Sequence, residues 1–112
     1  MPKIKTTQKA IKQAYPRIIS IPYCRAQYLL QYVAPFYYTC SNLYGWRSDV
    51  YIVDGVAIST GYAPFGNICP AYEIVRKWEE KARAVSETID HWRDRYEIVN
   101  GYLKEFIKEA TQ

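Results

Sequence analysis

The chain has 112 residues, 49% of them hydrophobic and 23% charged, which is the composition of one globular domain and excludes a disordered or low-complexity chain. It contains no apolar run of about 18 residues and begins without an apolar signal segment, so we predict a cytoplasmic protein with no membrane contact. Cys24, Cys40 and Cys69 form no CxxC pair, which indicates reduced thiols.

The net charge of +4 is unevenly distributed along the chain. Residues 1–48 carry seven basic side chains and no acidic one, because the first carboxylate is Asp49. Residues 49–112 carry eight basic and eleven acidic side chains, a net charge of −3. The basic half is therefore expected to meet either an external polyanion or an acidic surface of its own chain or of a second copy.

Residues 1–35 are predicted to form a basic arm of short helices. Thr6 or Thr7 can cap a first helix, which Pro16 must stop because its ring disfavours helical geometry in the preceding residue. A second helix is expected over residues 20–33, where a serine is followed closely by a proline suited to a first helical turn.

Residues 36–67 are predicted to form a three-stranded antiparallel β-meander with strands at 36–41, 46–53 and 56–62. Asp54 and Gly55 tolerate positive φ and predict a two-residue hairpin turn, whose register pairs Tyr51 with Ile58. Both faces of this sheet are partly apolar, so we expect it to be covered on both sides.

Residues 68–112 repeat apolar side chains at alternating spacings of three and four, the pattern of a coiled-coil seam. One continuous helix is favoured because the heptad phase does not shift, and a helical hairpin that breaks near Ser86 is the alternative. A helix of about 40 residues spans about 60 Å and would overhang a globule of this size, so we predict a homodimer. The dimer contacts would come from Ile89, Trp92, Tyr96, Val99, Leu103 and Phe106.

The predicted fold is therefore a single α+β domain with short N-terminal helices, a meander and a long C-terminal helix. The sequence has no catalytic, cofactor-binding or metal-binding motif. Its one histidine, His91, falls on the exposed side of the predicted helix, and the cysteines have no metal-ligand spacing. No glycine-rich phosphate loop is present either, so we predict a protein that is not an enzyme and needs no cofactor.

The aromatic residues are unusually many, with twelve tyrosines, seven of them in the acid-free residues 1–48. They suit a core, a protein interface, or a groove that stacks single-stranded nucleic acid. The predicted contacts with a protein partner are Arg47, Tyr51, Tyr62, Tyr37, Tyr38 and Phe65. The predicted contacts with nucleic acid are Lys3, Lys5, Lys9, Lys12, Arg17 and Arg25.

Three segments, at residues 44–51, 54–58 and 60–67, resemble a pattern in small uncharacterised proteins of phages and other mobile elements from low-GC Gram-positive bacteria. This resemblance implies a binding protein that inhibits or modulates a host nucleic-acid-processing complex by covering its surface, as anti-CRISPR proteins do. The alternative function is a nucleic-acid-binding regulator that uses the basic, tyrosine-rich half of the chain.

Overall fold

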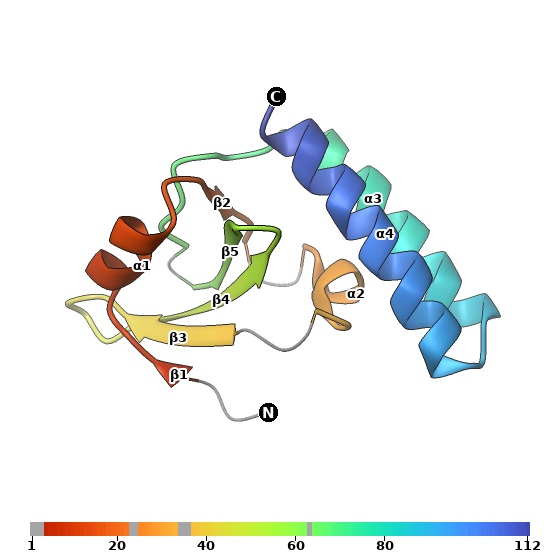
Figure 1. The fold of residues 1–112 in the computed structure, drawn as a ribbon, viewed down its shortest axis with the longest axis horizontal. Helices are drawn as coiled ribbons and strands as arrows, with labels where there is room; N and C mark the ends of the chain where they lie inside the picture. Colours follow the sequence, from red (N-terminus) through yellow and green to blue (C-terminus); the bar gives the residue numbers. More distant parts are fainter. Residues whose placement is uncertain (1–3, 23–24, 34–36, 63) are drawn as a thin grey trace.

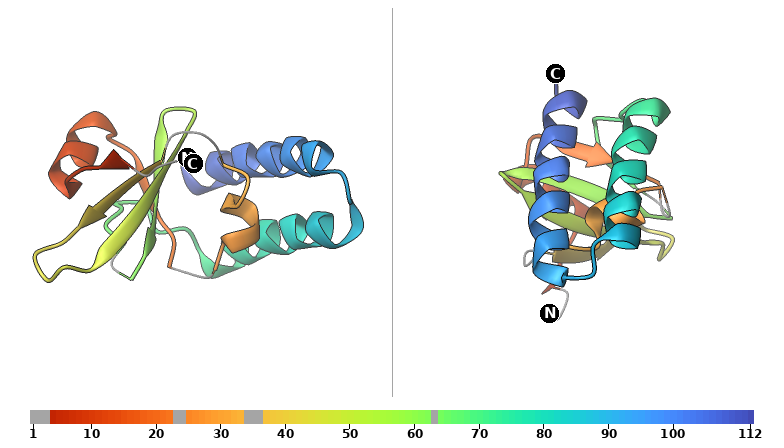
Figure 2. Two further views of the ribbon diagram at one scale, coloured as in Figure 1. Left: turned by 90° about the horizontal axis from the view of Figure 1, so that it is seen from below. Right: turned by 90° about the vertical axis from the view of Figure 1, so that its right-hand side faces the viewer.

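The computed structural model describes residues 4–22, 25–33, 37–62 and 64–112. Figures 1 and 2 show α1 on one side of a β-sheet and the antiparallel helices α3 and α4 on the other, with α2 between the sheet and this pair. The elements in chain order are β1 (Ile4–Lys5), α1 (Gln8–Ala14), β2 (Ile18–Ser20), α2 (Gln27–Leu30), β3 (Tyr37–Ser41), β4 (Arg47–Val53), β5 (Val56–Gly61), α3 (Tyr72–Thr88) and α4 (Trp92–Ala110).

The predicted three-stranded antiparallel meander is wrong, because the sheet has five strands in the order β1-β3-β4-β5-β2 and is mixed. The central strands β3, β4 and β5 are antiparallel as expected, but β1 pairs in parallel with β3 and β2 pairs in parallel with β5. The basic arm thus supplies both edge strands. These strands have two and three residues, too few to show a period, and their hydrogen-bonding partners lie more than thirty residues away.

The β4–β5 hairpin has the predicted turn and register. Asp54 and Gly55 adopt φ of 50° and 75°, and Tyr51 lies opposite Ile58. The positive φ at both turn positions matches the right-handed twist of the strands that the turn joins.

The N-terminal helices are confirmed in part. Helix α1 is capped by Thr7, whose Oγ1 accepts a hydrogen bond from the Ala10 N–H at 3.1 Å. The helix expected over residues 20–33 is wrong: Ser20 ends β2, and among the residues described there only 27–30 are helical. Ser20, which was expected to begin that helix, instead contacts the loop after β5: its hydroxyl accepts a hydrogen bond from the Gly66 N–H at 3.3 Å.

The single long helix is also wrong, and the hairpin alternative is the one observed. Helix α3 ends at Thr88, three residues take extended or loop geometry, and α4 begins at Trp92. The Arg95 side chain donates to the Ile89 carbonyl and so braces this turn. Each helix of the hairpin has its own apolar seam, and the three turn residues keep the spacing of three and four from Val85 through Ile89 to Trp92. The unbroken heptad phase therefore cannot distinguish a hairpin from a straight helix.

The sheet is covered on both sides, as expected. On one face Ile11 of α1 packs with Ile18, Cys40, Val50 and Ala57. On the opposite face the larger cluster joins the sheet to α2, α3 and α4, and its fully buried side chains include Ile19, Ile21, Leu29, Ile58, Leu103 and Phe106.

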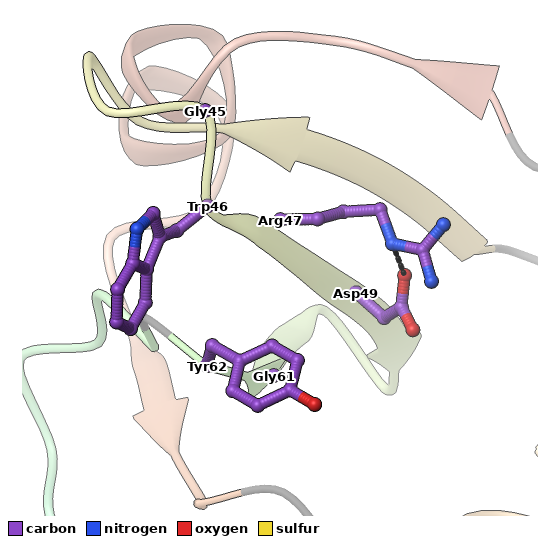
Figure 3. A pocket seen from close by; sticks show the side chains of 6 residues that line it. All are labelled: Gly45, Trp46, Arg47, Asp49, Gly61 and Tyr62. Atoms are coloured by element: carbon purple, nitrogen blue, oxygen red, sulfur yellow. Dashed lines mark ion pairs between the residues drawn. The ribbon is translucent and has the colours of Figure 1, made fainter.

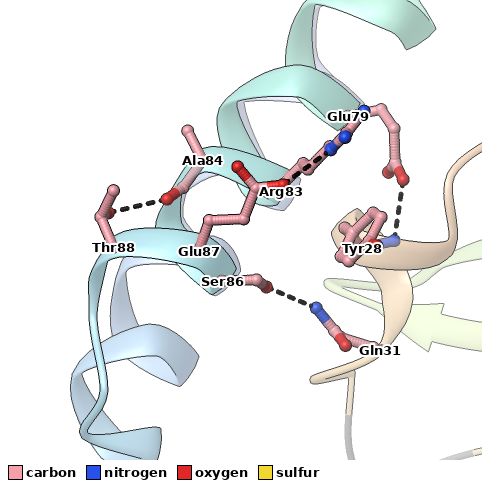
Figure 4. Close-up of polar contacts among 8 residues, drawn as sticks. All are labelled: Tyr28, Gln31, Glu79, Arg83, Ala84, Ser86, Glu87 and Thr88. Atoms are coloured by element: carbon pink, nitrogen blue, oxygen red, sulfur yellow. Dashed lines mark hydrogen bonds and ion pairs between the residues drawn. The ribbon is translucent and has the colours of Figure 1, made fainter.

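Helix α2 is joined to α3 through a partly buried carboxylate, Glu79 (Figure 4). Its two oxygens accept hydrogen bonds from the backbone N–H groups of Tyr28 and Leu29, both at 2.9 Å. Ala26, at the N-cap, has no side-chain acceptor, so Glu79 satisfies donors that a short helix leaves open. A second contact, from Gln31 Nε2 to Ser86 Oγ at 2.9 Å, fixes the other end of α2.

Replacing Glu79 tests this contact through its pH dependence. Burial raises the pKa of Glu79 above its ordinary value of 4.5, and the two N–H donors only partly offset the shift. A raised pKa means that the folded state binds more protons than the unfolded state, so the stabilisation is full below pH 4.5 and declines as pH rises through the folded pKa. Urea unfolding from pH 4 to pH 8 should show the free-energy difference between wild type and Glu79→Gln shrinking with increasing pH.

Glu109 should show the opposite dependence. Its carboxylate accepts from Lys77 Nζ at 2.5 Å and from Trp78 Nε1 at 3.2 Å, which ties the end of α4 to the start of α3. The hydrogen bond from Lys77 is the main cause that lowers the pKa of Glu109 below 4.5. Its stabilisation is therefore present above pH 4.5 and lost as pH falls through the folded pKa. In thermal melts, the advantage of wild type over Glu109→Gln should disappear in acid, and an advantage that grows in acid would contradict this contact.

Candidate functional site

One face of the sheet is only half covered by helices. Val53 and Ile58 lie under the helical side of the molecule and belong to the large core cluster. At the other end of the same face, Arg47 is exposed, and Tyr62, which follows β5, is 77% exposed. The uncovered end adjoins the turn between β3 and β4.

That turn is held by Asn42. Its side-chain Oδ1 accepts hydrogen bonds from the backbone N–H groups of Tyr44 at 2.9 Å and Trp46 at 3.1 Å, and its own N–H donates to the Trp46 carbonyl at 3.1 Å. Gly45 closes the turn with φ of 81°, a conformation that side chains with a Cβ rarely adopt. The turn is therefore ordered by its own hydrogen bonds.

The ordered turn holds large apolar side chains in water. Leu43 is fully exposed, Tyr44 is 86% exposed and Trp46 is 52% exposed. With Tyr62 they form a surface that we call the turn patch: Leu43, Tyr44, Trp46 and Tyr62. Single exposed apolar residues are common, but several gathered around one ordered turn mark a contact surface.

Figure 3 shows the side of the turn patch that faces the sheet. The Trp46 and Tyr62 rings meet edge to face, with centroids 6.1 Å apart and an interplanar angle of 85°. Together with Arg47, Asp49, Gly45 and Gly61 they line a hollow. Arg47 Nε lies 3.9 Å from an Asp49 oxygen, so the hollow carries one positive and one negative group side by side.

The structure separates the six predicted partner contacts into two groups. Arg47 and Tyr62 border the hollow, and the stacked Tyr37 and Tyr51 rings, 5.0 Å apart, line a neighbouring hollow beside α2. Tyr38 and Phe65 instead pack into the cluster under α1, on the opposite face of the sheet. These two side chains cannot share one contact surface with Arg47.

The six predicted dimer contacts are mostly used within the chain. Val99, Leu103 and Phe106 are buried in the core between α3, α4 and the sheet. Ile89 and Tyr96 are half-buried, whereas Trp92 is 64% exposed. The seam that predicted a homodimer is therefore largely filled by the hairpin, and the homodimer itself stays a prediction.

The six predicted nucleic-acid contacts do not all lie on one part of the molecule. Lys5, Lys9, Lys12 and Arg17 are exposed along β1, α1 and the start of β2. Arg25 lies on another side, with its guanidinium 5.1 Å from the Tyr72 ring centroid. Lys3 lies outside the described residues.

The candidate catalytic groups do not meet. His91 is exposed at the α3–α4 turn, 3.9 Å from an Asp94 oxygen, whereas Cys40 is buried in β3 under α1. Burial raises the pKa of the Cys40 thiol, and the Asp49 charge raises it further, so the thiol stays protonated. Cys40 and Cys69 are both free. Within the described ranges no three His, Cys, Asp or Glu side chains gather as a metal site, and no helix is long and apolar enough to cross a membrane.

Three residues of the turn patch were missing from the predicted site. Leu43, Tyr44 and Trp46 fall in and beside the segment read as a turn, and turns are usually built from small or polar residues. Large apolar side chains in such a segment are themselves a signal of a contact surface, and the sequence contained it.

Gly61 tests the geometry beneath the turn patch. It has φ of 125°, and a Cβ there would lie 2.6 Å from the Arg47 carbonyl oxygen. Gly61→Ala should therefore cost about 1–3 kcal/mol of stability in urea unfolding, because it adds backbone strain and a clash. Gly101→Ala is the matched control: its Cβ would meet nothing within 4 Å in helix α4, so it should stabilise by about 0.5–1 kcal/mol. Equal effects of the two substitutions would contradict the close strand approach at Gly61.

No protein-family model, curated protein or solved structure matches this chain. The function proposed next rests on the side chains of the turn patch and on their geometry.

Proposed function

We propose that this protein is a non-enzymatic binding module that docks on another protein through the turn patch. The observation that carries this proposal is the exposure of Leu43, Tyr44 and Trp46 on a turn that Asn42 holds rigid. A pre-ordered turn loses little backbone conformational entropy on binding, so less of the free energy gained by burying its apolar side chains is spent on ordering the loop.

The chemistry of the turn patch favours a protein partner over nucleic acid. Tyr, Trp and Arg are the residue types most enriched at the energetic centres of protein interfaces. Leu43, at the tip of the turn, has no ring to stack on a base. Arg47 is accompanied by Asp49, so this part of the surface has no excess of positive charge to hold phosphates.

The identity of the partner is proposed from the resemblance to mobile-element proteins. On that basis the partner is a host nucleic-acid-processing complex, and the protein inhibits or modulates it by covering its surface. The turn patch supports this mode of action, because occlusion requires only a stable contact and no catalytic group.

Self-association is the second use that this surface supports. With most of the heptad seam buried, a homodimer would have to use exposed apolar side chains, which among the described residues are those of the turn patch, Ile4, Tyr72 and Trp92. Measurement of mass by light scattering therefore accompanies the binding test below.

Substituting the tip of the turn should weaken partner binding by roughly 30-fold or more without unfolding the protein. In Leu43→Asp/Tyr44→Asp, charges replace two exposed side chains that contribute nothing to the core. Loss of such interface residues costs about 2 kcal/mol or more, which is roughly a 30-fold weaker affinity. The measurement is affinity capture from host cell extract with the wild-type chain as bait, followed by calorimetric titration of the purified captured protein.

The matched control is Trp92→Asp, which replaces another exposed apolar side chain, 64% exposed, with a charge at the α3–α4 end of the molecule (Figure 1). It should bind the partner with wild-type affinity. A turn variant that still binds, or a control that loses binding equally, would disprove the role of the turn patch. A dimer in light scattering that only the turn variant dissociates would assign the patch to self-association.

A further inference from the structure

The charge asymmetry of the sequence becomes an asymmetry in space. Residues 1–71 carry seven basic and two acidic side chains, and residues 72–112 carry eight basic and nine acidic ones. The described part of the first segment builds the sheet with α1 and α2, whereas the second segment contains α3 and α4. Figures 1 and 2 show α1 and the α3–α4 turn at opposite ends of the long axis. The excess positive charge therefore lies on the sheet side of the molecule.

The two groups of cations also differ in their partners. In α3 and α4, four of the eight cationic side chains, those of Arg76, Lys77, Arg83 and Lys108, have a carboxylate oxygen at 2.5–3.3 Å. Among the described residues, no carboxylate lies within 4.0 Å of the cationic groups of Lys5, Lys9, Lys12 or Arg17. Lys5 lies opposite Thr39 in the strand register, next to the Ile4–Tyr38 pair of the α1 face, so its side chain leaves the sheet on the face away from α1. We call the other three side chains, Lys9, Lys12 and Arg17, the α1 surface.

Helix α1 presents its lysines because of how it packs. It buries Ile11 against the sheet and leaves Lys9 and Lys12 exposed. These two are three residues apart and so are neighbours on the helix surface. Lys12 Nζ lies 5.9 Å from the Phe65 ring centroid, and the Lys12 side chain is exposed at the protein surface. Arg17 follows the helix, so a third exposed cation lies beyond its C-terminal end.

We propose that the α1 surface binds the phosphodiester backbone of nucleic acid. Lysine is a compact point charge that suits phosphate oxygens, and release of condensed counterions supplies the free energy of such contacts. An acidic protein is the less suitable ligand, because stable protein interfaces need an apolar centre. Among the described residues, the exposed large hydrophobic side chains lie outside the α1 segment itself, with Ile4 beside it on β1.

This second activity is independent of the turn patch. The turn patch would contact a protein, and the α1 surface would contact nucleic acid bound to the same assembly. Neither surface shares a side chain with the other, so each can be removed separately.

The experiment is fluorescence anisotropy with a short labelled DNA duplex and a single-stranded RNA of equal length, at about 50 mM and about 200 mM KCl. If all three cations contact phosphates of the duplex, a plot of the logarithm of the association constant against the logarithm of the salt concentration should have a slope of about −2.7. Affinity should then drop roughly 40-fold between the two salt concentrations.

The test variant is Lys9→Glu/Lys12→Glu, and the matched control is Lys104→Glu/Lys108→Glu, the same charge change on exposed positions of α4. The test variant should reduce the slope to about −0.9 and weaken low-salt binding at least about tenfold, whereas the control should change affinity less than about threefold. Circular dichroism melts confirm that both variants fold.

Absence of binding at low salt, or equal loss of binding in both variants, would overturn the proposal. Competition by polyglutamate as effective as that by unlabelled duplex would assign the surface to acidic protein instead. The turn variant Leu43→Asp/Tyr44→Asp should bind the labelled nucleic acids as the wild type does. Failure of one proposal can therefore be distinguished from failure of the other.

Discussion

The contact between Glu79 and the start of α2 joins the two halves of this molecule. Helix α2 has four residues, no side-chain cap of its own and too few hydrogen bonds to be stable in isolation. Glu79 reaches from α3 and accepts its first free N–H groups, which places Leu29 and Leu30 in the core between sheet and helices. Burial of this carboxylate costs solvation free energy, which is why its pKa is raised, and the two hydrogen bonds offset that cost only in part.

Once α2 is in place, the hairpin of α3 and α4 determines which surfaces remain for binding. The hairpin fills the heptad seam from within, because Val85 on α3 and Val99, Leu103 and Phe106 on α4 share one core. It covers only one end of the sheet, so the turn patch at the other end stays in water. The most exposed apolar side chains are thus held by the turn hydrogen bonds of Asn42 and by the β4–β5 pairing.

The elements that could be predicted were those specified by neighbouring residues. Asp54 and Gly55 have the φ angles of a hairpin turn, and Thr7 caps the helix that follows it. The edge strands β1 and β2 could not be predicted, because each is stable only through hydrogen bonds to a distant strand. In the candidate site, Arg47 and Tyr62 were found from the strand pattern. Tyr38 and Phe65 were misplaced, because the pattern does not show which face α1 covers.

The sequence by itself determined the apolar seam, the β-hairpin and the concentration of positive charge in residues 1–48. Whether the seam would face a second chain or fold back on its own was decided only by tertiary structure. A hairpin buries the same side chains as a dimer but does not lose the translational and rotational entropy that association of two chains costs. The heptad pattern is identical in both arrangements. The same holds for exposure: Leu43, Tyr44 and Trp46 are apolar in the sequence, but only the extent of the helical layer leaves them in water.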